Sequence, residues 1–283
     1  MDLWWTEEQT PGLRLGLRCE AVVERRRSAY QEIAVYRTQQ YGLLLALDDM
    51  VMTSEADEFI YHELLVHPCM SVAASPRRVL VVGGGDGGAV REVCKYPEVE
   101  RVVLAELDPE VIELSRRHLP GCAAALDDPR VEICVGDGLA YLAAAPAGAF
   151  DVILVDAPDP IGPAEGLFTT DFYALAARAL APSGLFAAQT ECPLLHGDLI
   201  RRVQAALRER FAVAALYWGV VPTYPGSMWS FSCAAKEALD LTRPGRSPAG
   251  PTRYWTPSVH RAAFALPPFV RALAEDEPTC PGN

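Results

Sequence analysis

The chain has 283 residues, half of them hydrophobic, with a formal net charge of −12 and a sequence pI near 4.9. Such an acidic chain is a poor partner for nucleic acid or anionic membrane surfaces, and no run of about 18 apolar residues predicts a membrane span. The eight cysteines are widely spaced without a C-x-x-C pair, and the first ten residues lack the pattern of a signal peptide. We therefore expect a cytoplasmic protein with reduced thiols.

Residues 1–70 are predicted to form a small N-terminal β domain. Partial period-two patterns bounded by turn residues predict strands within 13–26, 30–39 and 41–49. Residues 55–68 then follow helical spacing, and Phe59, Leu64 and Leu65 are the candidate core positions of that helix.

After a linker-like segment at 73–78, the second predicted domain, residues 71–283, alternates strands with helices. The predicted strands are 78–84, 99–107, 130–138, 149–160, 183–191, 213–221 and 229–236. The predicted helices are 89–96, 109–119, 139–145, 171–180 and 198–211. Alternating β and α units indicate an α/β fold with a parallel, doubly wound sheet.

Acidic residues follow four successive strands of this predicted sheet. They are Asp86 in the glycine loop "GGGDGG", Glu106, Asp137 with its neighbour Gly138, and the pair Asp156 and Asp159. Each alone has an ordinary explanation as a turn or a helix cap. Because ligands of open α/β sheets bind at the carboxyl ends of the strands, the set together predicts one acidic crevice.

The spacing within the crevice indicates an adenosine ligand with a cationic tail. Glu106 lies about twenty residues beyond the glycine loop, where a carboxylate binds ribose hydroxyls in nucleoside-binding folds. Asp137 is placed to accept a hydrogen bond from an adenine amino group. Asp86 would repel a pyrophosphate or the carboxylate of S-adenosylmethionine, but would bind an amine through a charge-assisted hydrogen bond. The predicted ligand is decarboxylated S-adenosylmethionine.

Over nearly its whole length the sequence resembles the spermidine synthase family of polyamine aminopropyltransferases. The resemblance is carried by "WTEEQTPG", "YQEIAVYRTQQYGLLLALDD", "VMTSEADEFIYHELL", "VLVVGGGDGGAVREVCKYPEVE", "LDDPRVEICVGDG", "DVILVDAPDPIGPAEGLF", "PTYPGSMW" and "YWTPSVHRAAFALPPF". It implies a small β domain on a Rossmann-like catalytic domain of the class I methyltransferase type, assembled as a homodimer or homotetramer. It also implies transfer of an aminopropyl group from decarboxylated S-adenosylmethionine to putrescine, giving spermidine and 5′-methylthioadenosine.

The resemblance further implies roles for the residues at matching positions. The catalytic proton acceptor would be Asp156, with Tyr61 and Tyr224 as hydroxyls near the attacking nitrogen. The donor and methylthioadenosine contacts would be Gln31, Asp86, Glu106, Asp137, Gly138 and Pro163. The polyamine contacts would be His62, Asp86, Asp156, Ala157, Pro158, Asp159 and Gln189. The resemblance implies no metal and no cofactor beyond the donor co-substrate, and His67, His118, His196 and His260 lack metal-ligand spacing.

Three positions depart from the family pattern. Asp49 stands where glycine is common after "LD", and Ala157 and Pro158 stand where small hydroxyl residues are common. A proline there removes a backbone donor and stiffens the loop, so cadaverine, agmatine and spermidine stay open as acceptors beside putrescine. Residues 157–168 are rich in Pro and Gly and are predicted to form a lid over the substrates.

Two other functions stay open. An S-adenosylmethionine-dependent methyltransferase shares the fold class, and a non-catalytic polyamine or nucleoside sensor would need the same acids for binding. Binding of the carboxylated nucleoside would favour the first, and absence of turnover would favour the second.

Overall fold

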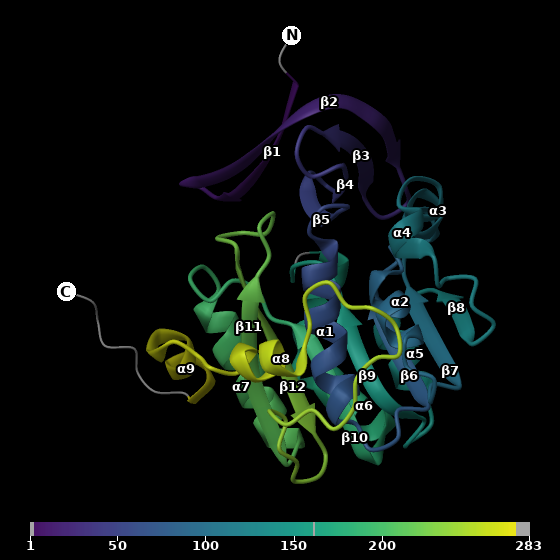
Figure 1. Ribbon diagram of the computed structural model, residues 1–283, viewed down its shortest axis with the longest axis vertical. Coiled ribbons are helices and arrows are strands. Elements are labelled where there is room, and N and C mark those ends of the chain that lie inside the picture. The colour runs from purple at the N-terminus through teal and green to yellow at the C-terminus, as the bar shows by residue number, and fades with distance from the viewer. Residues whose placement is uncertain (1–2, 161, 276–283) are drawn as a thin grey trace.

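The computed structural model describes residues 3–160 and 162–275, which form two β-sheets connected by helix α1 (Glu58–Val72). In Figure 1 the smaller sheet lies above the larger one, and α1 runs down from it across the face of the larger sheet. The fold is therefore α/β with a small N-terminal β domain, as the sequence predicts.

The smaller sheet is an antiparallel meander of five strands in chain order. Its strands are β1 (Leu3–Thr10), β2 (Leu13–Arg27), β3 (Glu32–Thr38), β4 (Leu43–Leu47) and β5 (Met50–Ser54). The turn between β4 and β5 places Asp48 and Asp49 at φ values of 47° and 63°, in the left-handed region. Hairpin turns with two left-handed positions favour Asn, Asp and Gly. Asp49 therefore preserves the turn, at the cost of backbone strain that glycine would avoid.

The larger sheet has seven strands in the order β11-β12-β10-β9-β6-β7-β8. Its strands are β6 (Arg78–Gly83), β7 (Arg101–Glu106), β8 (Val131–Val135), β9 (Phe150–Asp156), β10 (Leu180–Gln189), β11 (Val213–Val220) and β12 (Met228–Ala235). The five strands from β10 to β8 are parallel, but β12 pairs antiparallel with both β10 and β11. The prediction of a wholly parallel sheet is wrong at this edge, because the short connection between β11 and β12 only permits an antiparallel hairpin.

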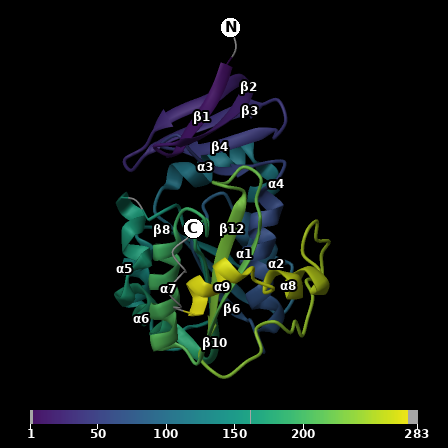
Figure 2. The ribbon, with the colours of Figure 1, turned by 90° about the vertical axis from the view of Figure 1, so that its left-hand side faces the viewer.

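Helices cover both faces of the larger sheet. They are α2 (Gly88–Cys94), α3 (Pro109–His118), α4 (Pro120–Ala123), α5 (Gly138–Ala144), α6 (Thr170–Ala179), α7 (Gly197–Arg210), α8 (Pro257–Ala263) and α9 (Pro268–Glu275), with the 3₁₀ helix η1 at Gly162–Phe168. Figure 2 shows α5, α6 and α7 on one side of the sheet and α1, α2 and α8 on the other. This double cover explains the continuous apolar strands: Val79 and Val81 of β6 pack on the α1 side, and Leu80 and Val82 pack on the other.

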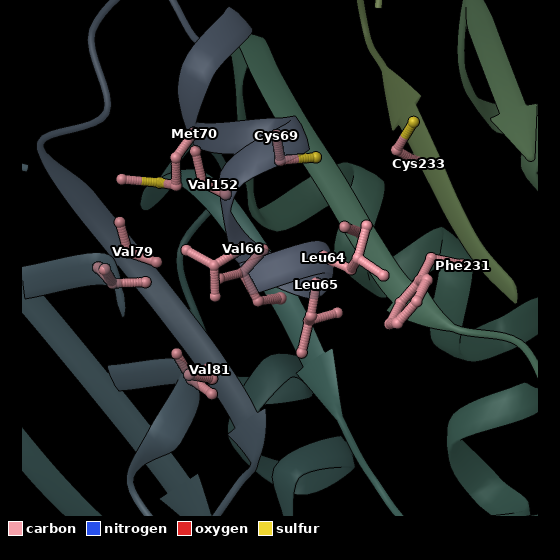
Figure 3. Close-up of a cluster of buried hydrophobic side chains, with 14 of the residues drawn as sticks. Leu64, Leu65, Val66, Cys69, Met70, Val79, Val81, Val152, Phe231 and Cys233 are labelled. Atoms are coloured by element: carbon pink, nitrogen blue, oxygen red, sulfur yellow. The ribbon is translucent and has the colours of Figure 1, made fainter. Parts of the chain in front are cut away.

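Helix α1 is the centre of the largest core cluster. Leu64 and Leu65 are fully buried, as predicted, and Figure 3 shows them beside Val81 and Phe231 of the sheet. The prediction for Phe59 is wrong, because this ring is half-buried and carries the Arg253 guanidinium 3.7 Å from its centroid.

The predicted domain division at residue 70 stays a prediction. The strands of the smaller sheet end at Ser54, and α1 packs against β9, β10, β11 and β12 of the larger sheet. Within residues 3–160 and 162–275, no helix has the length and apolar character needed to cross a membrane.

Candidate functional site

A cavity lies where the carboxyl ends of the parallel strands meet the underside of the smaller sheet. Its larger chamber has a volume of about 220 Å³ and extends from the glycine loop to Leu45 and Leu47 of β4. A smaller chamber of about 30 Å³ adjoins it and shares Tyr61, Asp159 and Tyr224 in its walls. The two chambers share part of their walls and are therefore treated as one cavity.

Most predicted site residues border these chambers. The larger chamber is bordered by Gln31, Tyr61, Asp86, Glu106, Asp137, Gly138, Asp156, Ala157, Pro158, Asp159 and Tyr224. Gln189 borders the smaller chamber. His62 is the exception within the described part of the chain, because it borders neither chamber. Pro163 lies within η1, and its side chain is outside the described part of the structure.

The glycine loop allows the end of β6 to approach Asp156 closely. Gly83 and Gly84 have φ values of 76° and 75°, which side chains rarely adopt. A Cβ atom on Gly84 would lie 2.6 Å from Oδ2 of Asp156, so any side chain there would displace this carboxylate. Because these glycines have no side chains, the backbone of the loop can lie directly against Asp156.

Glu106 ends β7 and holds the glycine loop in place. Its Oε2 accepts a hydrogen bond from the Gly85 amide at 3.0 Å, and its Oε1 accepts one from the Asp108 amide at 2.8 Å. Burial raises the pKa of Glu106 to about 7, although these two amides act to lower it. Gln31, from the smaller sheet's side, donates to Oδ2 of Asp108 at 3.0 Å. This bond connects the predicted ribose-binding region to the smaller sheet.

Asp137 and Gly138 form the start of α5. The Asp137 side chain is exposed and caps the helix by accepting from the Leu139 amide at 2.8 Å. Gly138 is buried, and a Cβ atom there would lie 2.4 Å from Val82 of β6. Glycine is therefore required for α5 to start this close to the sheet.

Asp86 and Asp156 both face Nε2 of His62 but differ in their acidity. The Nε2 atom of His62 is 3.4 Å from Oδ1 of Asp86 and 3.9 Å from Oδ2 of Asp156. Burial acts to raise the pKa of Asp86, but the His62 charge and the Gly88 amide outweigh it and lower that pKa. Burial raises the pKa of Asp156 to about 6, against the opposing effect of His62. At neutral pH Asp86 is therefore ionised, whereas Asp156 changes its protonation state only about one pH unit below neutrality.

The hydroxyl protons of both predicted catalytic tyrosines are already donated. Tyr61 donates to Oδ1 of Asp156 at 2.8 Å, and Tyr224 donates to the Met52 carbonyl. Burial raises the pKa of each phenol well above 10, so both remain protonated. Because each hydroxyl proton already has an acceptor, the two phenolic oxygens can only accept hydrogen bonds from an amine in the cavity.

Two carboxylates that the sequence analysis did not assign lie at or near the smaller chamber: Glu7 borders it, and Glu191 is bonded to Gln189, which borders it. Glu7 of β1 borders the chamber, and burial raises its pKa to about 7, with Asp159 nearby adding to the effect. Glu191 does not border the chamber and is fully buried. Burial and the Asp159 charge raise the pKa of Glu191 well above its ordinary value. Glu191 also accepts from Gln189 Nε2 at 3.2 Å and donates its amide to Gln189 Oε1 at 2.9 Å. Gln189 is thereby fixed, and its Nε2 also donates to the Ala157 carbonyl at 3.2 Å.

Each missed carboxylate had a signal in the sequence. Glu7 lies on the same face of β1 as buried Trp5, so it is an acid on the apolar face of an alternating strand. Glu191 follows β10 just as the predicted acids follow the four earlier strands.

His62, Asp86 and Asp156 can also bring one ligand atom each within 4.8 Å of the others, as in a metal site. The neighbours of His62 argue against that use. Its Nδ1 is bonded to Glu58, and burial is outweighed by Asp86 and Glu58, which raise the imidazole pKa well above 6.5. The imidazolium itself is thus the cation between these acids. The walls of the cavity are rich in carboxylates, and such walls suit a cationic ligand.

Two family models match the chain. The spermine/spermidine synthase domain matches residues 58–243, and the spermidine synthase tetramerisation domain matches residues 3–55. A polyamine aminopropyltransferase of Moorella thermoacetica is 46% identical over 96% of this chain and 96% of its own length. A polyamine aminopropyltransferase of Thermoanaerobacter sp. strain X514 is 44% identical over 98% of this chain and 100% of its own length.

Solved structures agree with these sequence matches. Spermidine synthase from Thermotoga maritima superposes with a TM-score of 0.90 at 34% identity, covering 96% of this chain and 94% of that one. A spermidine synthase in complex with the transition-state analogue AdoDATO superposes with a TM-score of 0.92 at 35% identity, covering 96% and 95%. The chain therefore belongs to the spermine/spermidine synthase family of polyamine aminopropyltransferases.

Proposed function

We propose that the protein transfers the aminopropyl group of decarboxylated S-adenosylmethionine to putrescine, forming spermidine and 5′-methylthioadenosine. The observation that carries this proposal is that Asp156 borders the larger chamber and is bonded to Tyr61, which borders both chambers. On one side lies the ionised Asp86, and on the other lies the acidic end formed by Glu7 and Asp159. A donor with one amine and an acceptor with two amines match this distribution of charge.

The larger chamber supports the choice of donor. Glu106 would accept from the ribose hydroxyls, Asp137 from the adenine amino group, and Asp86 would pair with the amine of the aminopropyl chain. The Asp86 carboxylate would repel the extra carboxylate of S-adenosylmethionine, which opposes the methyltransferase alternative. Gln31 and Pro163 are retained as proposed contacts to the methylthioadenosine part.

Proton transfer is the chemical task of Asp156. A free alkylamine resembles lysine, with a pKa of about 10.4, and must be neutral to attack carbon. With Asp156 at about 6, transfer would be uphill by about four units, or about 6 kcal/mol. The donor's sulfonium lowers the amine pKa further when both substrates are bound. The Tyr61 and Tyr224 oxygens would accept the amine's remaining N–H groups and aim its lone pair at the carbon.

The smaller chamber supports a diamine acceptor. Ala157 and Pro158 form an apolar wall beside the methylene chain, and Asp159 would bind the far ammonium. The hydrogen bonds of Gln189 to Ala157 and Glu191 would hold this wall in a fixed position relative to the Glu191 carboxyl group. The acceptor's length is then set by the separation between Asp156 and the acidic end.

We also propose that the chain assembles as a homo-oligomer through the smaller sheet. Residues 3–55 match a tetramerisation domain, and Trp4, Leu13 and Val22 of this sheet are exposed to solvent. Residues 157–168 are proposed as the lid, and the cytoplasm is the proposed location.

The test is an assay of 5′-methylthioadenosine release from decarboxylated S-adenosylmethionine with a panel of amines. Putrescine is expected to give the highest kcat/KM, followed by cadaverine, with agmatine and spermidine slower. Methyl transfer from S-adenosylmethionine without aminopropyl transfer would overturn the proposal in favour of a methyltransferase. Tight binding of both ligands without turnover would favour a sensor.

A further inference from the structure

A row of buried, alternating charges lies behind the two aspartates of the site. It begins at Arg91 of α2, continues through Glu58 and His62 on successive turns of α1, and ends at Asp86 and Asp156. The side chains of His62 and Glu58 are only 2% and 7% exposed, so solvent does not screen these contacts appreciably.

The His62 ring is held on both sides. Its Nδ1 lies 2.7 Å from Oε2 of Glu58, while its Nε2 faces Asp86 and Asp156. The ring also packs against Gly88, where a Cβ atom would lie 2.2 Å from Cε1 of His62. A ring with carboxylates at both nitrogens donates from both, and so it carries a proton on each.

The charged and titratable groups around His62 come from four elements. They are Glu58 and Tyr61 from α1, Asp86 from the glycine loop, Asp156 from β9, and Arg91 from α2 acting through Glu58. Three carboxylates thus surround one imidazolium; Asp86 and Asp156 border the larger chamber, whereas His62 borders neither chamber. His62 therefore acts on the ligands through the acids it touches.

Arg91 keeps Glu58 in place for this purpose. Its Nη1 and Nη2 donate to the two Glu58 oxygens at 3.0 and 2.9 Å, its Nε donates to Glu92 at 2.9 Å, and Nη1 also donates to the Gly121 carbonyl at 3.0 Å. This paired geometry fixes the direction of the Glu58 carboxylate. Without it, the Glu58 carboxylate would be free to turn away from Nδ1 of His62, and the imidazolium would lose the anion that faces this nitrogen.

We propose that Arg91, Glu58 and His62 form one positioning unit that keeps Asp86 anionic for the donor amine and holds Asp156 free to accept a proton. The proposal rests on the proposed function, and it gives His62 a role that acts through the two aspartates that its Nε2 faces. Arg91 and Glu58 then become positioning residues for a reaction they do not touch.

The two aspartates differ because the unit contacts them unequally. Asp86 is nearer to His62 and accepts from the Gly88 amide at 2.7 Å, so two donors stabilise its anion. Asp156 is farther away, and its Oδ2 has no hydrogen-bond partner among the described residues. The His62 imidazolium thus stabilises the Asp86 anion more strongly than the Asp156 anion, and Asp156 remains able to accept a proton.

The experiment compares Arg91→Gln with Lys95→Gln. Lys95 is the matched control, because it lies one turn further along the chain, where its ammonium pairs with Glu92 at 2.6 Å and donates to the Pro251 carbonyl at 2.8 Å instead of to Glu58. Arg91→Gln is expected to lower kcat/KM about tenfold and to move its acid limb up by about one pH unit. Arg91→Lys should restore part of the loss, and Lys95→Gln should stay within about twofold of the unchanged protein.

Coupling is tested by adding His62→Gln. If the three residues act as a unit, Arg91→Gln has little further effect once His62 is neutral, so the two losses do not multiply. Independent multiplication, or equal effects of Arg91→Gln and Lys95→Gln, would overturn the proposal.

A measurement without substrates separates this proposal from the proposed function. The chain has five histidines, so the NMR signal missing from His62→Gln identifies the His62 ring. This ring is expected to stay protonated to at least pH 8 in the unchanged protein and to lose its proton at lower pH in Arg91→Gln, in which Glu58 is no longer held at Nδ1 of His62. A His62 ring already neutral at pH 7 in the unchanged protein would overturn the positioning unit, whatever the enzyme's activity.

Discussion

Tyr61 donates its phenolic proton to one oxygen of Asp156 at 2.8 Å, and the other oxygen of that carboxylate is buried without a hydrogen-bond partner among the described residues. The bonded oxygen fixes the orientation of the carboxylate. The unbonded oxygen keeps its lone pairs free to take a proton, and the Asp156 residue borders the larger chamber. This asymmetry is the basis for assigning the general base to Asp156.

Asp156→Asn is expected to lower kcat by about 10²- to 10⁴-fold, the usual contribution of a general base. Donor affinity should change little, because Asp86 and Glu106 are retained. Asp151→Asn is the matched control, since Asp151 lies at the opposite end of β9 and pairs with Arg78. Steady-state kinetics and calorimetry with the donor provide both measurements, and near-normal turnover of Asp156→Asn would refute the assignment.

The pH dependence of kcat/KM follows from the acidity of Asp156. The base must be ionised, and its pKa is raised to about 6, so activity is expected to fall about tenfold per pH unit below this value. The Tyr61 hydrogen bond lowers that pKa, so Tyr61→Phe should move the acid limb to higher pH. Tyr217→Phe, which removes a buried hydroxyl bonded to the Leu64 carbonyl, should leave the limb in place. An acid limb that does not move in Tyr61→Phe would contradict this account.

Choice of donor is expected to depend on Asp86. Loss of a charge-assisted hydrogen bond in Asp86→Asn should weaken binding of decarboxylated S-adenosylmethionine about 10- to 100-fold. Binding of S-adenosylmethionine should weaken less or improve, because the repulsion of its carboxylate is removed. Asp137→Asn is the control, since a contact to adenine would affect both nucleosides equally. Titration calorimetry with the two nucleosides measures the ratio, and an unchanged ratio in Asp86→Asn would contradict the proposed role.

The strand-end acids could be predicted because a parallel sheet brings the carboxyl ends of its strands to one edge. Asp86, Glu106 and Asp156 follow from that rule without knowledge of any contact. The same rule applied to β10 would have indicated Glu191. The strand content, the central helix and the apolar faces of β6 were predictable for a similar reason, since each depends on local periodicity.

The position of His62 could not be predicted from local patterns. Whether its ring enters the cavity depends on the rotation of α1 against the glycine loop, and this is set by packing with Gly88. The antiparallel β12 depends in the same way on pairing between distant segments. The conformation of Glu191 could not be predicted either. Its backbone has a φ of 71°, in the left-handed region, and the sequence "QTEC" contains no residue type that favours this region at that position.

The stability of the protein should reflect the cost of keeping Asp156 buried. A carboxyl group with a pKa of about 6 in the folded state and 3.8 as its ordinary value favours the folded state most when protonated. Its ionisation therefore destabilises the fold as pH rises through the window from about 4 to 6. Above that window the cost is about 3 kcal/mol. Asp156→Asn should raise the free energy of unfolding at pH 8 and have little effect at pH 4, as measured by urea denaturation. Equal effects at both pH values would show that Asp156 is not titrating as described.

Acceptor binding should release protons from the acidic end of the smaller chamber. At neutral pH Glu7 is about half protonated, because burial and the Asp159 charge raise its pKa to about 7, and the same two causes raise the pKa of Glu191 well above its ordinary value. An arriving ammonium lowers these values, so the acids ionise and putrescine affinity should increase as pH rises from about 6 to 8.

Calorimetry of putrescine binding in buffers of different ionisation enthalpy measures this release directly. Without the donor's sulfonium both amines of putrescine stay protonated, so the released protons must come from the protein. Glu7→Gln is expected to reduce the release and flatten the pH dependence of the affinity. Glu8→Gln is the matched control, because the neighbouring Glu8 is exposed and pairs with Arg14. Proton uptake on binding, or the same release in both variants, would mean that the far ammonium is not received by these acids.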